Sequence, residues 1–236
     1  MSVRLKAPTV ETTIGDEHAN KLRRKFDDAA PVYANIRSRL DGVRGYLLAA
    51  DRSEQLTILR KAYVYAALTA NTPVQFADEA YGRWIGGSDI RRAAYETAAI
   101  PHTRGGYIKH GLKHFNSAIS EPLAAMEDGE WFRAAELIRA SDDLKGLSRV
   151  KAHFMVALVG GRTACLDTHC ERFVNRATPD DITIDPNKMG DYKAGVRALE
   201  TVDSQWSPFV AQWIAFDHER DTVTSHQLFY DSLNIP

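Results

Sequence analysis

The chain has 236 residues, of which 44% are hydrophobic and 26% charged, and its net charge is −1. This length suffices for a substantial core, and the near-neutral charge excludes a protein coated in basic residues, so that any nucleic-acid contact has to come from a local patch. No run of eighteen apolar residues and no signal-like N-terminus occurs, which leads us to expect an intracellular protein without a membrane partner.

The cysteine count limits the cofactors. Cys165 and Cys170 are the only cysteines in the sequence. Two thiols cannot form a disulfide framework or ligate a four-cysteine cluster, so we expect no iron–sulfur cluster and no required cofactor.

Helical periodicity dominates the sequence. Residues 1–16 lack it and are expected to form an N-terminal arm, whereas the rest of the chain predicts an all-α fold because few stretches alternate with period two. A turn is expected at Gly105-Gly106-Tyr107, and Ser53 is expected to begin the apolar helix that ends at Thr69. The other expected helices span about residues 17–50 with a break at Pro31, 74–85, 90–99, 122–140, 150–159, 191–199 and 208–216.

Residues 144–173, LKGLSRVKAHFMVALVGGRTACLDTHCERF, carry the most specific pattern: a short turn, an apolar helix and a lone carboxylate, Asp167. A tight turn with a glycine lets backbone N–H groups approach a phosphate, and the following helix points its positive end at the same place. This arrangement would hold one nucleic-acid strand without reading its sequence. The expected DNA-binding residues of the turn are Lys145, Gly146, Ser148 and Arg149.

This segment resembles the core of the helix-hairpin-helix DNA glycosylases, whose hairpin reads roughly leucine-proline-glycine-valine-glycine and whose catalytic aspartate often precedes a threonine-histidine pair, here Thr168-His169. The resemblance covers about residues 55–175. It implies one domain, residues 17–236, with two helical lobes: a core lobe of about residues 55–175 and a second lobe from the N-terminal and C-terminal helices. It also implies a monomeric enzyme that cuts the N-glycosidic bond of a damaged or modified base in DNA.

Asp167 has two interpretations that are compatible with each other. After a nucleotide has been flipped out of the stack, a carboxylate stabilises positive charge on the sugar or deprotonates an attacking water. Aspartate is also a favoured N-cap, and a helical pattern begins at Thr168. We expect Asp167 to be catalytic.

Lys151 is the second catalytic candidate. Lyase-type relatives carry their lysine at the position of Val150, and one helical step of roughly 100° turns Lys151 toward another face. Simple inheritance of lyase chemistry is therefore not expected, and Lys151 either reaches the pocket or contacts a phosphate. The turn also departs from the family pattern, with Lys145 in place of proline and Ser148 in place of the second glycine.

The resemblance implies roles for further residues. Asn71 matches a loop residue that fills the gap left by the extruded base, although a turn residue is an equal alternative. Tyr63, His153 and His169 are candidates for the base pocket, against the alternative of core packing. Family members often hold a monovalent cation at the hairpin through backbone carbonyls, which by position are those of Asp142, Leu144 and Leu147.

His110 and His114 stand four residues apart and would share one helix face. No third ligand lies at a recognisable metal spacing in the sequence, so solvent or a phosphate backbone is the favoured neighbour of both rings.

Two other functions stay open. The segment from Val150 to Phe154 resembles diverged viral members of the family, some of which are thought to modify a hypermodified thymine in DNA without excising it. The third interpretation is a DNA-binding helix-hairpin-helix module without catalysis, in which Asp167 is only a cap. Substitution of Asp167 by asparagine separates the enzymes from the module.

Overall fold

The computed structural model describes residues 12–178 and 183–235, and these form helices and connecting turns without a strand. The all-α prediction is confirmed. The helices of the described residues are α1 (Asp16–Asp28), α2 (Ala30–Ala49), α3 (Arg52–Leu68), α4 (Val74–Ile85), α5 (Ile90–Tyr95), α6 (His102–Ala118), α7 (Ser120–Glu127), α8 (Trp131–Ala140), α9 (Arg149–Leu158), α10 (Thr168–Ala177), α11 (Met189–Glu200), α12 (Pro208–Arg220) and α13 (Gln227–Ser232).

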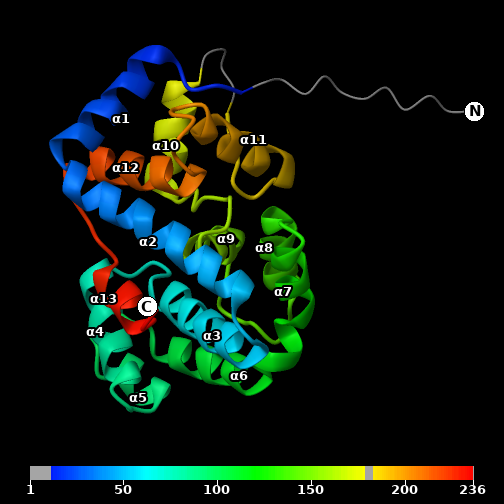
Figure 1. Cartoon of the computed structure of the whole chain (residues 1–236). Helices are drawn as coiled ribbons and strands as arrows, with labels where there is room; N and C mark the ends of the chain where they lie inside the picture. The colour runs from blue at the N-terminus through cyan, green and yellow to red at the C-terminus, as the bar shows by residue number, and fades with distance from the viewer. Residues whose placement is uncertain (1–11, 179–182, 236) are drawn as a thin grey trace, which may run out of the picture.

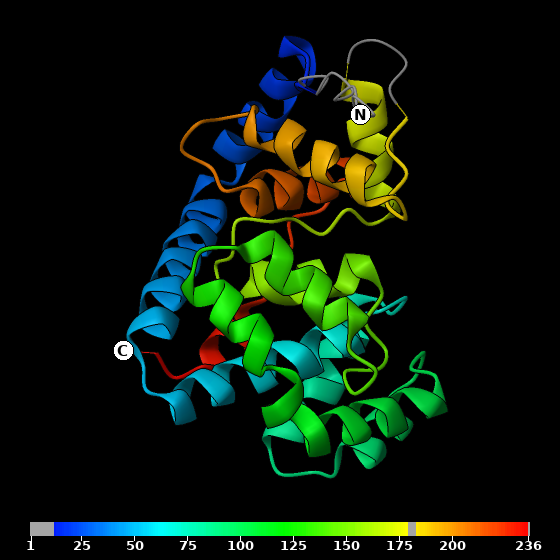
Figure 2. The same cartoon turned by 90° about the vertical axis from the view of Figure 1, so that its right-hand side faces the viewer.

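The helices gather into two groups, which Figures 1 and 2 show one above the other. The α12 group consists of α1, α10, α11 and α12, and the α3 group consists of α3 to α9 with α13. The long α2 runs between them and contacts both α12 and α3. Helix α10 lies beside α12, and α13 packs on α4 and α3. The two groups therefore divide the chain differently from the expected core lobe, which included α10 and left out the C-terminal helix.

The predicted burial of the first core helix is confirmed. Every residue from Ala62 to Leu68 of α3 is buried, and α4, α6 and α9 pack around it. The helix begins one step earlier than expected, because Asp51 is its N-cap: Asp51 Oδ1 accepts hydrogen bonds from the backbone N–H of Ser53 (2.8 Å) and Glu54 (3.0 Å).

Two predicted helix boundaries were wrong. Gly105-Gly106-Tyr107 is not a turn but lies within the continuous α6, where a Cβ on Gly105 would come within 2.8 Å of Arg91 Cα on α5. The glycine thus serves close helix packing. The stretch 122–140 divides into α7 and α8 at Gly129, whose φ of +75° is one that an L side chain rarely adopts.

Most of the expected N-terminal arm lies outside the described residues. Its last part is packed against the α12 group: Ile14 is buried, and the backbone N–H of Gly15 donates to the carbonyl of Ala177 at 2.8 Å. No helix among the described residues is long and apolar enough to cross a membrane.

Helices α6 and α3 approach each other closely at Gly111. A Cβ at this position would lie 2.0 Å from Tyr63 Oη, which itself donates a hydrogen bond to the carbonyl of Lys145 at 3.1 Å. The absence of a side chain at Gly111 therefore makes room for the phenol that supports the turn before α9.

Gly111→Ala is expected to lower the free energy of unfolding by about 1–3 kcal/mol, because the added methyl group overpacks the contact with Tyr63. Gly106→Ala, on the same helix, is the matched control: its Cβ would meet no heavy atom of another described element within 4 Å. This variant is expected to be neutral or stabilised by up to about 1 kcal/mol. Urea denaturation measures both, and equal stability of the two variants would contradict the close packing.

Candidate active site

A cleft of about 680 Å³ draws its walls from both helix groups. One side is lined by the α3–α4 turn, by the turn before α9 (residues 141–148) and by the start of α9. The other side is lined by the start of α10, by helix α12 and by the segment that follows α12. Clefts of this size are typical of small-molecule or cofactor sites. The structure brings Asp167, Lys151, Asn71, His169, Gly146 and Ser148 to this one cleft.

Asp167 is the N-cap of α10. Its Oδ1 accepts hydrogen bonds from the backbone N–H groups of His169 (3.1 Å) and Cys170 (3.0 Å). The side chain is partly exposed and lines the cleft. The cap uses one carboxylate oxygen, so the capping role and a role in the cleft are compatible in this geometry.

The segment that leads to Asp167 is fixed from two sides. Tyr192 Oη of α11 accepts a hydrogen bond from the backbone N–H of Leu166 (3.1 Å) and donates one to the carbonyl of Ala164 (2.8 Å). The side-chain oxygen of Gln212, on α12, accepts from the backbone N–H of Cys165 at 3.3 Å. Because both partners are buried, these hydrogen bonds are shielded from water and restrain the segment that carries Asp167.

Lys151 lies in the first turn of α9, which Ser148 caps by accepting a hydrogen bond from the Lys151 N–H. Its Nζ is 3.3 Å from Thr69 Oγ1 and 4.9 Å from the centroid of the Phe154 ring. Val150 and Lys151 both line the cleft. Of the two alternatives for Lys151, the geometry agrees with the first, since the long side chain reaches the cleft from the first turn.

Aromatic side chains make up much of the remaining wall: Phe154, Phe209, Trp213, Phe216 and His226. The rings of Trp213 and His226 have centroids 4.1 Å apart, and His226 Nδ1 lies 2.8 Å from Tyr65 Oη. Burial lowers the pKa of His226 to about 3, so its ring is neutral at physiological pH. The rings are tilted against one another and all but Phe216 are buried, so they make this part of the wall apolar and neutral.

The sequence did not reveal this wall. Trp213 and His226 stand far along the chain from residues 144–173, and no motif marks them. Arg104, whose guanidinium donates to Thr72 Oγ1 at 2.7 Å, also lines the cleft and was not predicted as a site residue. The packing of α12 on α10 and of α6 on α3 brings these residues to the site.

The turn before α9 has the shape that the sequence indicated. Gly146 has φ +90°, a conformation that favours glycine, and the hydroxyl of Ser141 accepts from the backbone N–H groups of Asp143 and Leu144, both at 3.3 Å. Lys145 and Ser148 are exposed, whereas Leu144 and Leu147 anchor the turn in the core.

The expected cation at this turn is not tested by the geometry. Among the described residues, the hydrogen bonds of the turn go to the Ser141 hydroxyl and the Lys145 carbonyl, which leaves the carbonyls of Asp142, Leu144 and Leu147 available for other partners. Binding of a monovalent cation there stays a prediction.

Asn71 and His169 both lie at the cleft. Asn71 is exposed and has a left-handed backbone conformation, with φ +50°. It is therefore a turn residue, and its side chain lies at the cleft. The His169 ring packs edge-on against Phe216, at 5.5 Å between centroids.

Tyr63 and His153 are not part of the cleft wall. Both are fully buried. Tyr63 supports the turn through its bond to Lys145, and His153 lies between the rings of Phe132 and Tyr192. Both side chains are therefore part of the core, which is the alternative to a place in the base pocket.

Arg149 is engaged inside the protein and is not available as predicted for a DNA phosphate. Its Nε lies 2.7 Å from Glu136 Oε1 on α8, and its guanidinium also donates to the carbonyls of Pro186 and Asn187. The side chains of Arg149 and Glu136 are each only 12% exposed. The positive charge at this position thus joins α9 to α8 and to the segment before α11.

His153 completes the same network. Its Nε2 is 3.3 Å from Glu136 Oε1, and its Nδ1 is 2.6 Å from Thr163 Oγ1. A carboxylate only accepts, so Nε2 carries the proton and Nδ1 accepts from the Thr163 hydroxyl. Burial opposes ionisation of Glu136, but the hydrogen bonds from His153 and Arg149 and the Arg149 charge outweigh it and lower the pKa of Glu136 to about 2.

No family model matches the chain, and no curated protein and no solved structure shows significant similarity to it.

Glu136→Gln is expected to destabilise the protein by about 2 kcal/mol at neutral pH, because glutamine keeps the shape but removes the charge that faces Arg149 and His153. The folded pKa of Glu136, about 2, lies below its ordinary value of 4.5. The contribution of the carboxylate is therefore complete above about pH 4.5 and is lost as the pH falls toward 2.

Denaturation of both proteins between pH 3 and 7 measures this difference in stability. Glu121→Gln is the control, because the Glu121 side chain is 69% exposed and its ion pair with Arg133 is long, at 3.9 Å. Its effect is expected to stay within about 0.5 kcal/mol. A loss in the Glu136 variant that is independent of pH would contradict the assignment of the network.

Proposed function

We propose that this protein is a DNA glycosylase that binds a flipped-out nucleotide in the cleft and cuts its N-glycosidic bond with the help of Asp167. One observation carries the proposal: Asp167 and Lys151, predicted from the sequence as the catalytic pair, line the same aromatic-walled cleft, and the glycine turn lies at its edge. A base inside a duplex is out of reach of any side chain, so an extruded base needs a cleft of this kind.

The chemistry follows from the wall and the carboxylate. The partly exposed Phe216 offers a ring on which an extruded base can stack, and the buried rings of Phe154, Trp213 and the neutral His226 make the wall apolar. As the bond between the sugar C1′ and the base nitrogen breaks, positive charge develops on the sugar and the Asp167 carboxylate stabilises it. Asp167 also accepts a proton from the attacking water, whose oxygen bonds to C1′; the base keeps the electron pair of the broken bond and takes up a proton from solvent. This reaction requires no cofactor.

The edge of the cleft supports DNA as the partner. The turn at Gly146 and the N-terminus of α9 present backbone N–H groups, and the exposed Lys145 adds a positive charge. Asn71 stands at another turn of the same side, between α3 and α4, where a polar side chain can enter the space left by an extruded base. Such contacts position the strand without reading its sequence.

A second function is favoured by the place of Lys151. A lysine amine in the cleft supplies a positive charge beside a bound base, which would stabilise an anionic leaving group on that base. A glycosylase-fold enzyme that modifies a hypermodified thymine without excision would need this device. A catalytically silent DNA-binding module is the third candidate, and the experiments below distinguish it.

Asp167→Asn is expected to reduce turnover of the cognate modified DNA by at least about 100-fold, because the variant loses the charge and the base. Asparagine also caps helices, so folding and DNA affinity should be kept. Glu171→Gln is the matched control, since Glu171 belongs to the first turn of the same helix and lines the same cleft. Single-turnover kinetics measure the rates, and full activity of the Asp167 variant would exclude the proposed chemistry.

Lys145→Ala is expected to weaken DNA binding across sequences and to flatten its salt dependence by a slope of about 0.9 on duplex DNA, because one phosphate contact is lost. Lys21→Ala is the control, since Lys21 lies on α1 and pairs with Glu17 at 2.7 Å. Fluorescence anisotropy over a range of salt concentrations gives both slopes. An unchanged slope for Lys145→Ala would remove the turn from the interface.

A further inference from the structure

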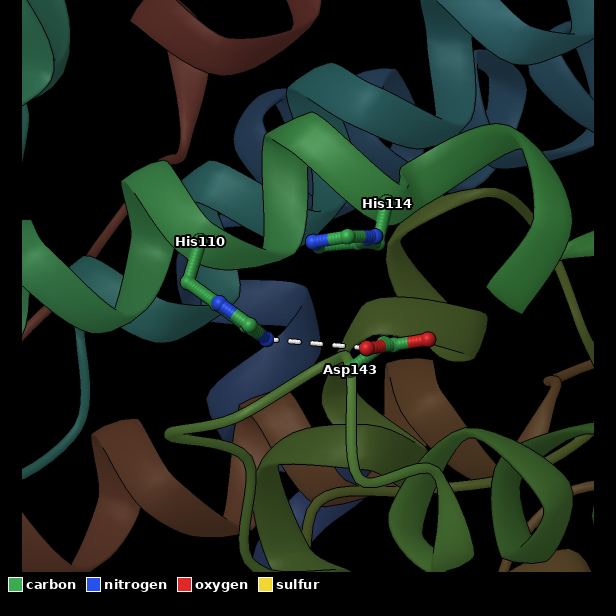
Figure 3. Close-up of side chains that lie close together, drawn as sticks. All are labelled: His110, His114 and Asp143. Carbon is green, nitrogen blue, oxygen red and sulfur yellow. Dashed lines mark ion pairs between the residues drawn. The ribbon is translucent and has the colours of Figure 1, made fainter.

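Two histidines of α6 and one carboxylate of the turn before α9 lie together on the surface, apart from the residues that line the cleft. His110 and His114 stand one helical turn apart, and Asp143 faces them from the segment that begins the turn (Figure 3). A third ligand for the histidine pair is not recognisable from sequence spacing, because Asp143 lies some thirty positions further along the chain. In the folded chain, Asp143 lies close enough to the two histidines to be the third ligand.

The geometry of the three side chains is close to that of a metal site. The potential ligand atoms all lie within 4.8 Å of one another, and His110 Nε2 is 3.5 Å from Asp143 Oδ1. The centroids of the two imidazole rings are 4.8 Å apart. Ligands of a tetrahedral Zn²⁺ stand about 2.0–2.2 Å from the ion, so small rotations of these partly exposed side chains suffice to close the site.

We propose that His110, His114 and Asp143 bind a divalent transition metal ion of the Zn²⁺ class. Two imidazoles and one carboxylate are a ligand set that zinc uses, and the partial exposure of the three residues leaves a fourth position for water. A simple ion pair between His110 and Asp143 would not require the second imidazole. The ring of His114 nevertheless points to the same space (Figure 3).

The two thiols of the chain are poor competitors for the metal. Both cysteines are buried, and burial raises the pKa of Cys165 to about 12, so the thiolate that would bind a metal does not form at neutral pH. A metal that binds the native protein with one-to-one stoichiometry therefore has the histidine pair as its favoured site.

The metal would have a structural consequence. It would join α6 to the turn whose other supports are the Tyr63 bond to Lys145 and the Ser141 hydroxyl. Asp143 is three residues before Gly146. A bound ion would therefore restrict the same turn that forms the edge of the cleft.

Isothermal titration of the metal-free full chain, prepared without a histidine tag, with ZnCl₂ tests the proposal. The wild type should bind one ion per chain. His110→Gln, His114→Gln and Asp143→Asn should each weaken binding by at least tenfold. His102→Gln should leave it unchanged, because His102 lies on the same helix but packs on Tyr95 instead. At a free Zn²⁺ concentration about 100 times Kd, the melting temperature of the wild type should rise by about 5–10 °C.

Hydrogen exchange provides a second readout. Zn²⁺ should slow amide exchange in residues 141–148 of the wild type and leave it unchanged in His114→Gln. Absence of one-to-one binding by the wild type, or equal affinity in all the variants, would overturn the proposal. DNA plays no part in these measurements, so their outcome is independent of the proposed glycosylase activity.

Discussion

Two buried side chains from the C-terminal third of the chain hold the segment that carries Asp167. The Tyr192 phenol bonds to both the N–H of Leu166 and the carbonyl of Ala164, and Gln212 bonds to the N–H of Cys165. This segment connects the two helix groups, so the same bonds fix the carboxylate and the wall opposite α9. Buried hydrogen bonds of this kind provide the precise restraint that the proposed catalytic role of Asp167 requires.

Helix α9, across the cleft from Asp167, is held by a network that includes charged side chains. Arg149, Glu136 and His153 form a partly buried charged cluster that joins α9 to α8. Removal of one member leaves its partners without compensation, which is why such clusters are sensitive to substitution although their net contribution to stability is modest. The cluster fixes the helix whose first turn carries Lys151. The charges of Arg149 and Glu136 thus contribute to architecture, whereas Lys145 is exposed.

Local patterns in the sequence predicted much of the fold. Helical periodicity located most of the helices, because each one buries an apolar face, and α4 was predicted to the residue. The glycine turn and Asp167 were found because their chemistry is local: a left-handed glycine at Gly146 and a cap before Thr168. The prediction of a turn at Gly105 failed, since a glycine that permits close packing cannot be distinguished by sequence from one that permits a turn.

The rest of the site depends on contacts between distant parts of the chain. Whether a basic residue is free to bind a phosphate depends on what packs beside it. Arg149 pairs with Glu136 inside the protein, and its own sequence neighbours do not indicate this. The same holds for His153, which is enclosed in the core, and for Trp213 and His226, which reach the cleft only through the packing of α12 and the segment after it. The meeting of Asp143 with the histidines of α6 is a further case, because no fixed sequence spacing relates a helix to a turn.

The most direct test of the central claim is mass spectrometry of nucleosides and free bases after the protein has been incubated with DNAs that contain uracil, oxidised purines, alkylated bases or 5-substituted thymines. We expect one class of substrate to release its free base and to leave an abasic site. A changed base that is still attached to its sugar would contradict excision and favour base modification. Tight binding without any change in any substrate would contradict catalysis by Asp167 altogether.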